Sequence, residues 1–251
     1  MAGHSKWSQI KRDKASNDSK RGAIFSKMAR EIYVATREAG PNPALNMRLR
    51  IAMERSKREG MSGDTIECAI LKGSGGGPDA VEYQTVIYEG YGSGGVAVMA
   101  VALTENRNRT AAEVRGAFNR HGGTLGETGT VGWQFDTIGQ IVVQAIGQDT
   151  DDISMIAIDA GAADVVVEGD EVIVTTEPSD MSEVADALRA GGLDVVDQTV
   201  TRVPQNTVDV DPRHLATVVR LLEALEELDD VQDVFTNASF SEDPAEVEAV
   251  V

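Results

Sequence analysis

Cysteine and histidine are scarce in this 251-residue chain, and long apolar runs are missing. The single cysteine, Cys68, excludes an intramolecular disulfide and a cysteine-based zinc site, and it fits a reducing compartment. The three histidines, His4, His121 and His214, are too dispersed to suggest a metal cluster. No apolar run approaches the roughly 20 residues of a membrane span, and the first seven residues lack the apolar stretch of a signal peptide. We therefore expect a cytoplasmic protein with no metal, no cofactor and no membrane partner.

The net positive charge of the chain lies in its first 72 residues, which hold all of its lysines. They hold all seven lysines and eight arginines against eight acids, a net charge of +7, whereas residues 73–251 hold eight arginines against 33 acids, a net charge of −25. A protein that binds a polyanion needs a local positive surface. The N-terminal third is therefore the candidate nucleic-acid-binding end. The acidic remainder is either simply solvated or repels nucleic acid and so confines contact to the basic end.

Capping signals and apolar spacing divide this N-terminal third into a basic tail and three helices. Residues 1–22 hold six lysines and arginines and almost no apolar side chains, so we expect them to be mobile until they meet a partner. The helices are predicted to run from Ile24 to Gly40, from an N-cap at Asn42 to Gly60, and from an N-cap at Ser62 to Gly73. In the second helix Leu45 belongs to the apolar stripe. In the third, Cys68 is expected to face the core or lie half-buried.

A glycine-rich linker, Gly73–Pro78, precedes a part of the chain with strand periodicity. Strands over Tyr83–Tyr88 and Val96–Leu103 are predicted to form a hairpin through a glycine-rich turn. A helix from Ala111 to His121 follows, opened by a capping box at Thr110.

Residues 139–203 have the order strand, helix, strand, strand, helix, strand, which is typical of the split-βαβ or ferredoxin-like unit. A helix over 212–228 and a strand over 231–236 have no partner of their own, and they would complete the sheet that begins at residue 83. The expected fold class is α+β, an N-terminal helical domain followed by two α+β domains with ferredoxin-like (split βαβ) sheets, one inserted in the other. The predicted domains are 1–78, the discontinuous 79–138 with 204–251, and the inserted 139–203.

Three motifs that suggest chemistry are better explained as structure. Gly90-x-Gly92-x-x-Gly95 matches the dinucleotide fingerprint, but that motif leads into a helix and here a strand follows, so a hairpin turn is expected. Asp149-x-Asp151-Asp152 lacks the glycine and final glutamate of a calcium loop and predicts a solvated helix N-terminus. Nothing pairs Cys68 with a positioned base. We therefore expect no enzyme and no small-molecule substrate.

Two features leave alternatives open. Arg107 and Arg109 lie between a strand and a helix N-terminus, where they either bind a phosphate or carboxylate of a ligand or pair with acids of their own domain. Trp7 lies among four cations, and it either stacks on an unpaired base or folds back onto the helical domain as an apolar anchor.

The sequence resembles the YebC/PmpR family over nearly its whole length. The resemblance rests on Met1–Trp7, Lys20–Gly22 with Phe25–Lys27, Arg30–Ile32, Tyr88–Gly92, Asn106–Thr110, Phe118–Gly123, Gly129–Phe135 and Asp230–Val234. It implies a helical N-terminal domain followed by two α+β domains, one inserted in the other. It also implies a non-enzymatic regulator of gene expression: members are commonly described as probable DNA-binding transcriptional regulators, others aid the synthesis of proline-rich stretches on the ribosome, and mitochondrial relatives activate translation of cytochrome c oxidase.

Together, the residues and the resemblance predict a nucleic-acid-binding regulator of gene expression without a catalytic centre. Its partner is promoter DNA or ribosomal RNA, and in the second case the ribosome; a protein-interaction module is the alternative of another class. The candidate nucleic-acid-binding residues are His4, Lys6, Trp7, Lys11, Arg12, Lys14, Lys20, Arg21, Lys27, Arg30, Arg48, Arg55, Lys57, Arg107 and Arg109.

Overall fold

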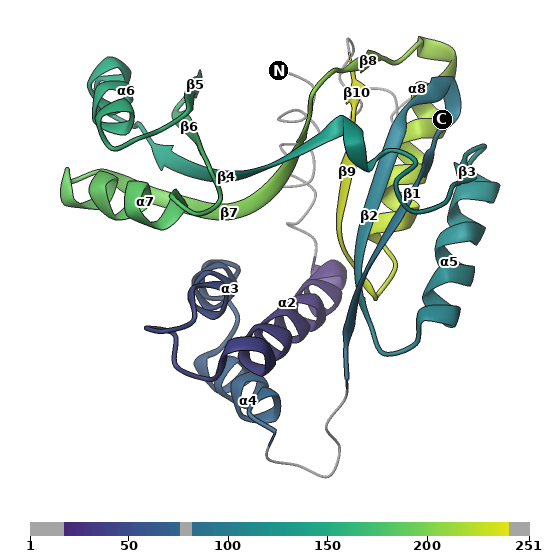
Figure 1. Ribbon diagram of the computed structural model, residues 1–251, viewed down its shortest axis with the longest axis horizontal. Coiled ribbons are helices and arrows are strands. Elements are labelled where there is room, and N and C mark those ends of the chain that lie inside the picture. Colours follow the sequence, from purple (N-terminus) through teal and green to yellow (C-terminus); the bar gives the residue numbers. More distant parts are fainter. Residues whose placement is uncertain (1–17, 76–81, 241–251) are drawn as a thin grey trace. The chain divides into compact units, whose positions relative to one another are not determined.

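The computed structural model describes residues 18–75 and 82–240, with side chains from Gly22 onward. The helices are α2 (Asp18–Ala39), α3 (Met47–Arg58), α4 (Gly63–Gly73), α5 (Arg107–Arg120), α6 (Thr150–Asp159), α7 (Met181–Ala190) and α8 (Pro212–Glu226), with short 3-10 turns η1 (Ser93–Gly95) and η2 (Gly132–Gln134) (Figure 1). The strands are β1 (Gln84–Tyr91), β2 (Ala97–Thr104), β3 (Thr124–Leu125), β4 (Phe135–Gln144), β5 (Asp164–Glu168), β6 (Glu171–Thr176), β7 (Asp194–Pro204), β8 (Val208–Asp209), β9 (Val231–Thr236) and β10 (Ala238–Ser239). Among the described residues, no helix combines the length and apolar character needed to cross a membrane.

The fold is α+β, as predicted, and its contacts form two compact units. Asp136–Val203 is one unit, and the residues before and after it form the other. The three-domain division with boundaries at residues 78, 138 and 203 stays a prediction.

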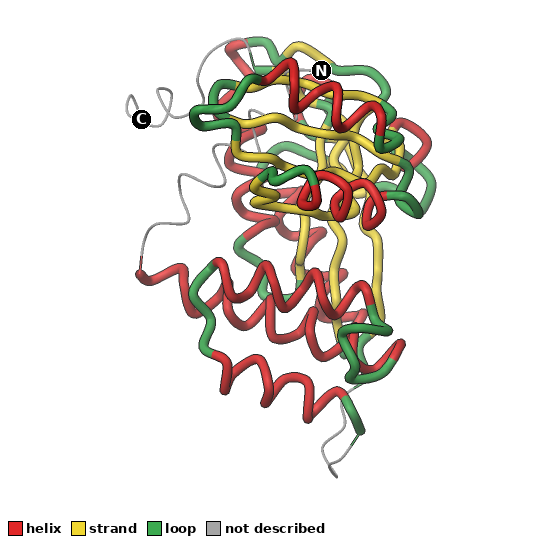
Figure 2. Tube along the Cα trace, turned by 90° about the vertical axis from the view of Figure 1, so that its left-hand side faces the viewer, coloured by secondary structure: helices red, strands yellow, loops and turns green. Residues whose placement is uncertain are grey.

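Helices α2, α3 and α4 pack around a small apolar core, because each contributes one apolar stripe. Ile32, Leu49 and Ile66 are almost completely buried in it. Figure 2 shows the three helices packed side by side. Ser62 is the N-cap of α4, as predicted, and its side chain accepts a hydrogen bond from the backbone N–H of Thr65.

The predicted starts of the first two helices are wrong. Helix α2 begins at Asp18 rather than Ile24, so residues 18–22 are helical although they lie outside the apolar stripe; the aspartate suits the positive end of the helix dipole, and Lys20 and Arg21 are good helix formers. The expectation for residues 1–17 lies outside the described part of the chain. Helix α3 begins at Met47 with Asn46 as its N-cap, not Asn42.

Two apolar side chains that were expected inside are on the surface. Leu45 precedes α3 and is 82% exposed, because the later helix start places it in the turn rather than in the apolar stripe. Cys68 is exposed on α4. In that helix the buried residues are Ile66 and Ala69, and the 100° step of an α-helix places the intervening cysteine outside their face.

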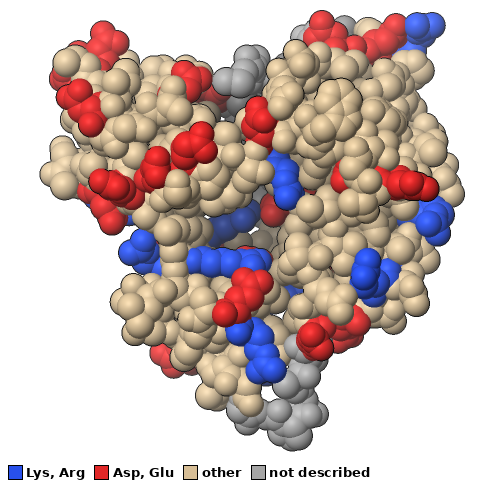
Figure 3. All heavy atoms as spheres, viewed as in Figure 1, with Lys and Arg blue, Asp and Glu red and all other residues tan. Residues whose placement is uncertain are grey.

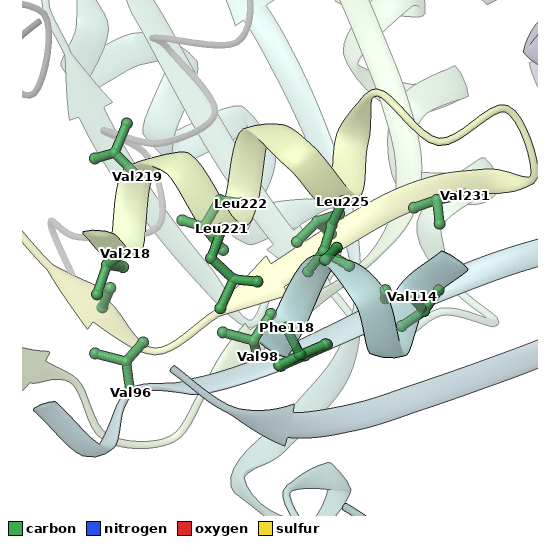
Figure 4. Packing of buried hydrophobic residues seen from close by; sticks show 14 of the residues in the cluster. Val96, Val98, Val114, Phe118, Val218, Val219, Leu221, Leu222, Leu225 and Val231 are labelled. Atoms are coloured by element: carbon green, nitrogen blue, oxygen red, sulfur yellow. The ribbon is translucent and has the colours of Figure 1, made fainter. Parts of the chain in front are cut away.

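The main sheet has the strand order β3-β1-β2-β9, and its pairs are antiparallel. The pairing of β9 with β2 joins the end of the chain to the hairpin, as the sequence predicts. Helices α5 and α8 cover one face of this sheet (Figure 1). Phe118 of α5 and Leu221, Leu222 and Leu225 of α8 are fully buried there against β2 residues such as Val98 (Figure 4).

Close backbone approach explains the glycines of the β1–β2 hairpin. A Cβ on Gly90 would lie 2.5 Å from the carbonyl oxygen of Thr124 and 2.7 Å from the Phe118 ring, so a larger residue cannot fit without movement. Gly94 and Gly95 have positive φ angles of 76° and 78°, which favour glycine. This glycine-rich segment is a turn between two strands, which confirms the hairpin interpretation over a phosphate-binding loop.

The second face of the main sheet is covered by the segment that leads into β4. Val131 and Phe135 are buried there with Ala97 and Met99 of β2. The segment is held by the buried carboxylate of Glu89, which accepts hydrogen bonds from the backbone N–H groups of Gly129, Val131 and Gly132 at 2.6–2.9 Å.

The unit Asp136–Val203 has the sheet order β5-β6-β4-β7, which is the strand order of the split-βαβ fold. Its elements β6 and α7 have the bounds that the sequence predicts. Ile141 and Val143 of β4 and Val174 of β6 are fully buried. Asp149 is the N-cap of α6, which agrees with the solvated helix N-terminus predicted there.

A single buried carboxylate, Asp230, connects four elements of the larger unit. It lies between α8 and β9 and is 2% exposed. Its Oδ2 accepts hydrogen bonds from the hydroxyls of Thr110 (2.6 Å) and Thr104 (3.0 Å) and from the Arg109 guanidinium (2.8 Å). Its Oδ1 lies 3.7 Å from Nη2 of Arg30 on α2. Asp230 therefore ties α2, the end of β2 and the first turn of α5 to the start of β9.

The same contacts correct the predicted start of α5. The helix begins at Arg107 with Asn106 as its N-cap, rather than at a Thr110 capping box. Thr110 is fully buried because its hydroxyl points at Asp230 instead of capping the helix.

Ionisation of Asp230 is favoured in the folded protein. Desolvation by burial disfavours the carboxylate, but hydrogen bonds from Arg109, Thr110 and Thr104 outweigh it and hold the pKa below its ordinary value. A carboxylate whose pKa is lower in the folded state contributes stability above its unfolded pKa, and this contribution is lost as the pH falls through the folded value.

Replacing Asp230 by asparagine should therefore lower the free energy of unfolding at pH 7 by about 2–3 kcal/mol, because three donors lose an anionic acceptor. The difference between variant and wild type should shrink as the pH falls below the ordinary carboxylate range. Denaturant unfolding at several pH values measures it. The control is Asp229→Asn, which removes an exposed carboxylate and keeps the carbonyl that Arg30 contacts. Equal stability of the two variants would show that the Asp230 carboxylate does not stabilise the contact between α2, β2, α5 and β9.

Candidate nucleic-acid interface

The described part of the helical region is basic, although less so than the whole N-terminal third. Residues 18–75 hold 11 lysines and arginines against seven acids, whereas residues 136–203 hold two arginines against 15 acids. On the face shown in Figure 3, Lys and Arg side chains gather in the region of α2 and α3, and acidic side chains dominate the unit Asp136–Val203. The described part of the helical region is therefore net basic, and the unit Asp136–Val203 is strongly acidic.

Arg48 is half-buried and bonded to carboxylates of the helical region. Its guanidinium bonds to Glu31 at 2.8 Å and also contacts Glu38, so it links the start of α3 to α2. Partial burial disfavours the charge, but the two carboxylates raise the pKa of Arg48 above its ordinary value. This side chain has a structural role that the sequence analysis did not predict.

Lys27 contacts the end of α8, and Arg30 contacts the turn that follows it. The Lys27 ammonium donates to the carbonyl oxygen of Glu226, the last residue of that helix, and Arg30 donates to the carbonyl oxygen of Asp229. Carbonyls at a helix C-terminus lack intrahelical partners and carry the negative end of the helix dipole, so cations are favoured there. Arg30 also lies over the Tyr83 ring, 5.4 Å from its centroid.

Arg55 and Lys57 are exposed near the end of α3. Within residues 22–75 and 82–240, neither side chain forms an ion pair. They lie in the last turn of their helix, where the dipole favours cations. Among the predicted site residues within 22–75, these two are exposed and form no ion pair with the described residues.

The two arginines at the N-terminus of α5 have different surroundings. Arg109 pairs with Asp230 at 2.8 Å, and this hydrogen bond raises its pKa. Arg107 is exposed, and no described carboxylate pairs with it. The geometry therefore gives Arg109 the partner expected of a structural residue, while Arg107 points to solvent beside the helix N-terminus.

The remaining predicted residues are those near the start of the chain. His4, Lys6, Trp7, Lys11, Arg12 and Lys14 lie outside the described residues. Lys20 and Arg21 lie in the first turn of α2, and their side chains are outside the described part. A role for them in binding stays a prediction.

Two exposed apolar side chains were missed as candidate binding residues. Trp133 is 69% exposed, and its indole N–H donates to the carbonyl oxygen of Thr130 in the segment that Glu89 holds. Leu45 is exposed in the α2–α3 turn. The helical spacing around Leu45 predicted a buried stripe, and no periodic signal distinguishes Trp133. Among the described residues, no group of three or more His, Cys, Asp or Glu side chains could hold a metal ion.

Comparisons with known proteins agree along the whole chain. Residues 5–76 match the model of the TACO1/YebC protein N-terminal domain, and residues 83–238 match that of the TACO1/YebC second and third domain. A probable transcriptional regulatory protein of Thermomicrobium roseum is 57% identical over the full length of both chains. One of Thermus thermophilus is 48% identical over 94% of this chain and 96% of its own length.

A solved structure extends the agreement to the fold. The crystal structure of a conserved hypothetical protein from Aquifex aeolicus is 44% identical and superimposes with a TM-score of 0.82, covering 90% of this chain and 93% of the other. With both domain models matched in order and the fold shared, the chain belongs to the TACO1/YebC family.

Proposed function

We propose that this protein is a non-enzymatic regulator of gene expression that binds nucleic acid through its basic N-terminal third. The observation that carries the proposal is the sorting of cations in the structure. Arg48 and Arg109 are bonded to the protein's own carboxylates, whereas Arg55, Lys57 and Arg107 are exposed without an ion pair to the described residues. Cations left unpaired on a protein with a net charge of −18 suit a polyanionic partner.

The acidic remainder supports contact at one end only. Phosphates are repelled by the unit Asp136–Val203, with its 15 acids, and attracted by the cations of the helical region and of the first 17 residues. This repulsion disfavours non-specific contact of nucleic acid with the rest of the protein surface.

For the partner we propose promoter DNA, because the curated relatives are named probable transcriptional regulatory proteins. The alternative is ribosomal RNA, with the protein aiding synthesis of proline-rich stretches. A cationic segment on a strongly acidic body suits brief docking on a folded RNA surface at least as well as binding along DNA. Both alternatives use the same basic end.

A protein-interaction module is the second candidate, and exposed apolar side chains favour it. Met155 and Ile158 on the outer face of α6 are 64% and 60% exposed. Contiguous exposed apolar residues often mark protein contacts. In this view the inserted unit docks a partner protein, and the basic end is incidental.

The first test changes the free cations of α3. The double variant Arg55→Ala/Lys57→Ala should weaken nucleic-acid binding about tenfold. It should also reduce the slope of log affinity against log salt by about 1.4 for single strands or 1.8 for duplex, because two phosphate contacts are lost. The matched control, Arg115→Ala/Arg220→Ala, removes the same charge from exposed positions on α5 and α8. Equal losses in both variants would mean that net charge rather than this helix end governs binding.

The second test separates the two arginines of α5. Arg109→Ala should lower the melting temperature by about 3–6 °C, because Asp230 loses a charged donor. Arg107→Ala should leave melting unchanged and weaken nucleic-acid binding. Thermal unfolding and fluorescence anisotropy with labelled nucleic acid measure the two effects. If Arg107→Ala instead lowers stability without affecting binding, the proposed role of Arg107 is wrong.

The third test distinguishes DNA from the ribosome. A promoter-binding protein should stay with DNA after RNase treatment of a cell extract, and its loss should change transcript levels at the bound promoters. A ribosome-bound protein should sediment with ribosomal particles and leave them at raised salt, and its loss should lower output from proline-rich messages at unchanged transcript levels. If the protein is in neither fraction but co-purifies with a partner protein, the result favours the protein-interaction module.

A further inference from the structure

Exposed apolar side chains concentrate on one part of the unit Asp136–Val203. Of the 11 large apolar side chains that are exposed in the described residues, five come from residues 146–167: Ile146, Met155, Ile158, Val166 and Val167. They belong to the turn after β4, to α6 and to β5, and α6 packs on β5 (Figure 1). Exposed apolar residues that are scattered singly are normal, whereas a group on adjacent elements indicates a contact surface.

Helix α6 places one of these side chains beside the edge of the sheet. Ile156 lies next to α7, because a Cβ on Gly191 at the end of α7 would be 3.5 Å from its Cγ2. The 100° step of an α-helix places Ile158 on the opposite side of α6, away from α7. Since α6 packs on β5 and β6, that side adjoins the β5 edge of the sheet. We call the exposed face of α6 together with β5 (Asp164–Glu168) the α6–β5 surface.

Strand β5 also offers its backbone. It is the outermost strand in the order β5-β6-β4-β7, and among the described residues it pairs with β6 alone. An edge strand presents unpaired N–H and C=O groups, which proteins usually protect with lysine, proline or a covering segment. The centre of β5 is instead a run of three valines, in which Val166 and Val167 are 37% and 48% exposed. Such an edge can accept a strand from another chain.

Charge selects the kind of strand that fits. Asp151, Asp152 and Asp159 of α6 and Asp164 of β5 are exposed, and none of them forms an ion pair with the described residues. The whole unit holds 15 acids against two arginines. A second copy of the same surface would therefore bring like charges together, and nucleic acid would be repelled. A segment that carries lysine or arginine has the complementary charge.

We propose that the α6–β5 surface binds another protein, which adds an extended segment flanked by lysine or arginine to the edge of β5. Backbone hydrogen bonds to β5 supply affinity in this mode of recognition, and the side chains beside the strand supply specificity. The added strand covers Val166 and Val167, and its cations lie against the aspartates of α6 and β5. The proposal names the surface and the class of partner for a protein contact, and it does not depend on nucleic-acid binding by the basic end.

The test uses two labelled synthetic peptides with the full-length protein. Both have a core of alternating valine and threonine; one has lysines at each end and the other has glutamates. Fluorescence anisotropy should show that the lysine peptide binds at least about tenfold more tightly than the glutamate peptide, because of the unpaired aspartates. With the lysine peptide in excess, hydrogen exchange of the wild-type protein should slow at the amides of residues 164–168.

Variants of the two edge strands provide the matched comparison. Val167→Lys introduces a cation on the β5 edge and should weaken binding of the lysine peptide about tenfold. Val200→Lys makes the same change on β7, the other edge strand of this sheet, where the valine is 50% exposed, and it should bind the peptide as wild type does. Asp151→Lys/Asp164→Lys should reverse the preference toward the glutamate peptide. Thermal unfolding checks that each variant is folded.

Several results would overturn the proposal. Equal binding of both peptides, or equal losses in Val167→Lys and Val200→Lys, would mean that the α6–β5 surface does not select a basic strand. Peptide binding without slower exchange in β5 would mean that no strand is added there. A wild-type dimer in sedimentation that Val167→Lys dissociates would assign the edge to a second copy. The variant Arg55→Ala/Lys57→Ala should bind the lysine peptide normally, so a failure of the nucleic-acid proposal is recognised separately.

Discussion

The buried carboxylate of Asp230 is the constraint on which the larger unit depends. Burying a charge is unfavourable unless it is fully hydrogen-bonded, and Asp230 meets this condition only when β2, α5 and the start of β9 come together, with Arg30 of α2 alongside. Thr104, Arg109 and Thr110 lie 120–126 residues before Asp230, so they reach it only in the folded protein. One side chain thus makes the position of a helix near the start of the chain depend on a strand near its end.

Contacts at and near Asp230 also engage three of the predicted binding cations. Lys27 donates to a carbonyl at the end of α8, Arg30 donates to the carbonyl of Asp229 in the turn that follows, and Arg109 donates to the carboxylate of Asp230. Their charge stabilises the protein itself. Arg55 and Lys57 in the last turn of α3, and Arg107 at the start of α5, do not take part in these contacts and remain exposed. Cations bonded within the protein and cations left in solvent are therefore separated by geometry, although they are intermixed in the sequence.

Local signals predicted elements well, and long-range contacts could not be predicted. The bounds of β6, α7 and β9 follow from alternating or helical apolar spacing, which acts within a few residues. The partner of Arg109 lies 121 residues away, so the sequence left its role open. Asn42 and Asn46 are equally good N-caps by composition; Asn46 caps α3 because its side chain also reaches carbonyls at the end of α2.

The failed prediction at Leu45 is informative for the same reason. An apolar residue in the stripe of a helix is expected to be buried, because burial removes its side chain from water. Here the turn chemistry of Asn42 and Asn46 overrides the spacing and leaves the leucine outside. Sequences that break a local rule without a structural gain commonly do so at functional sites. A leucine held in solvent by the hydrogen bonds of its own turn is such a break.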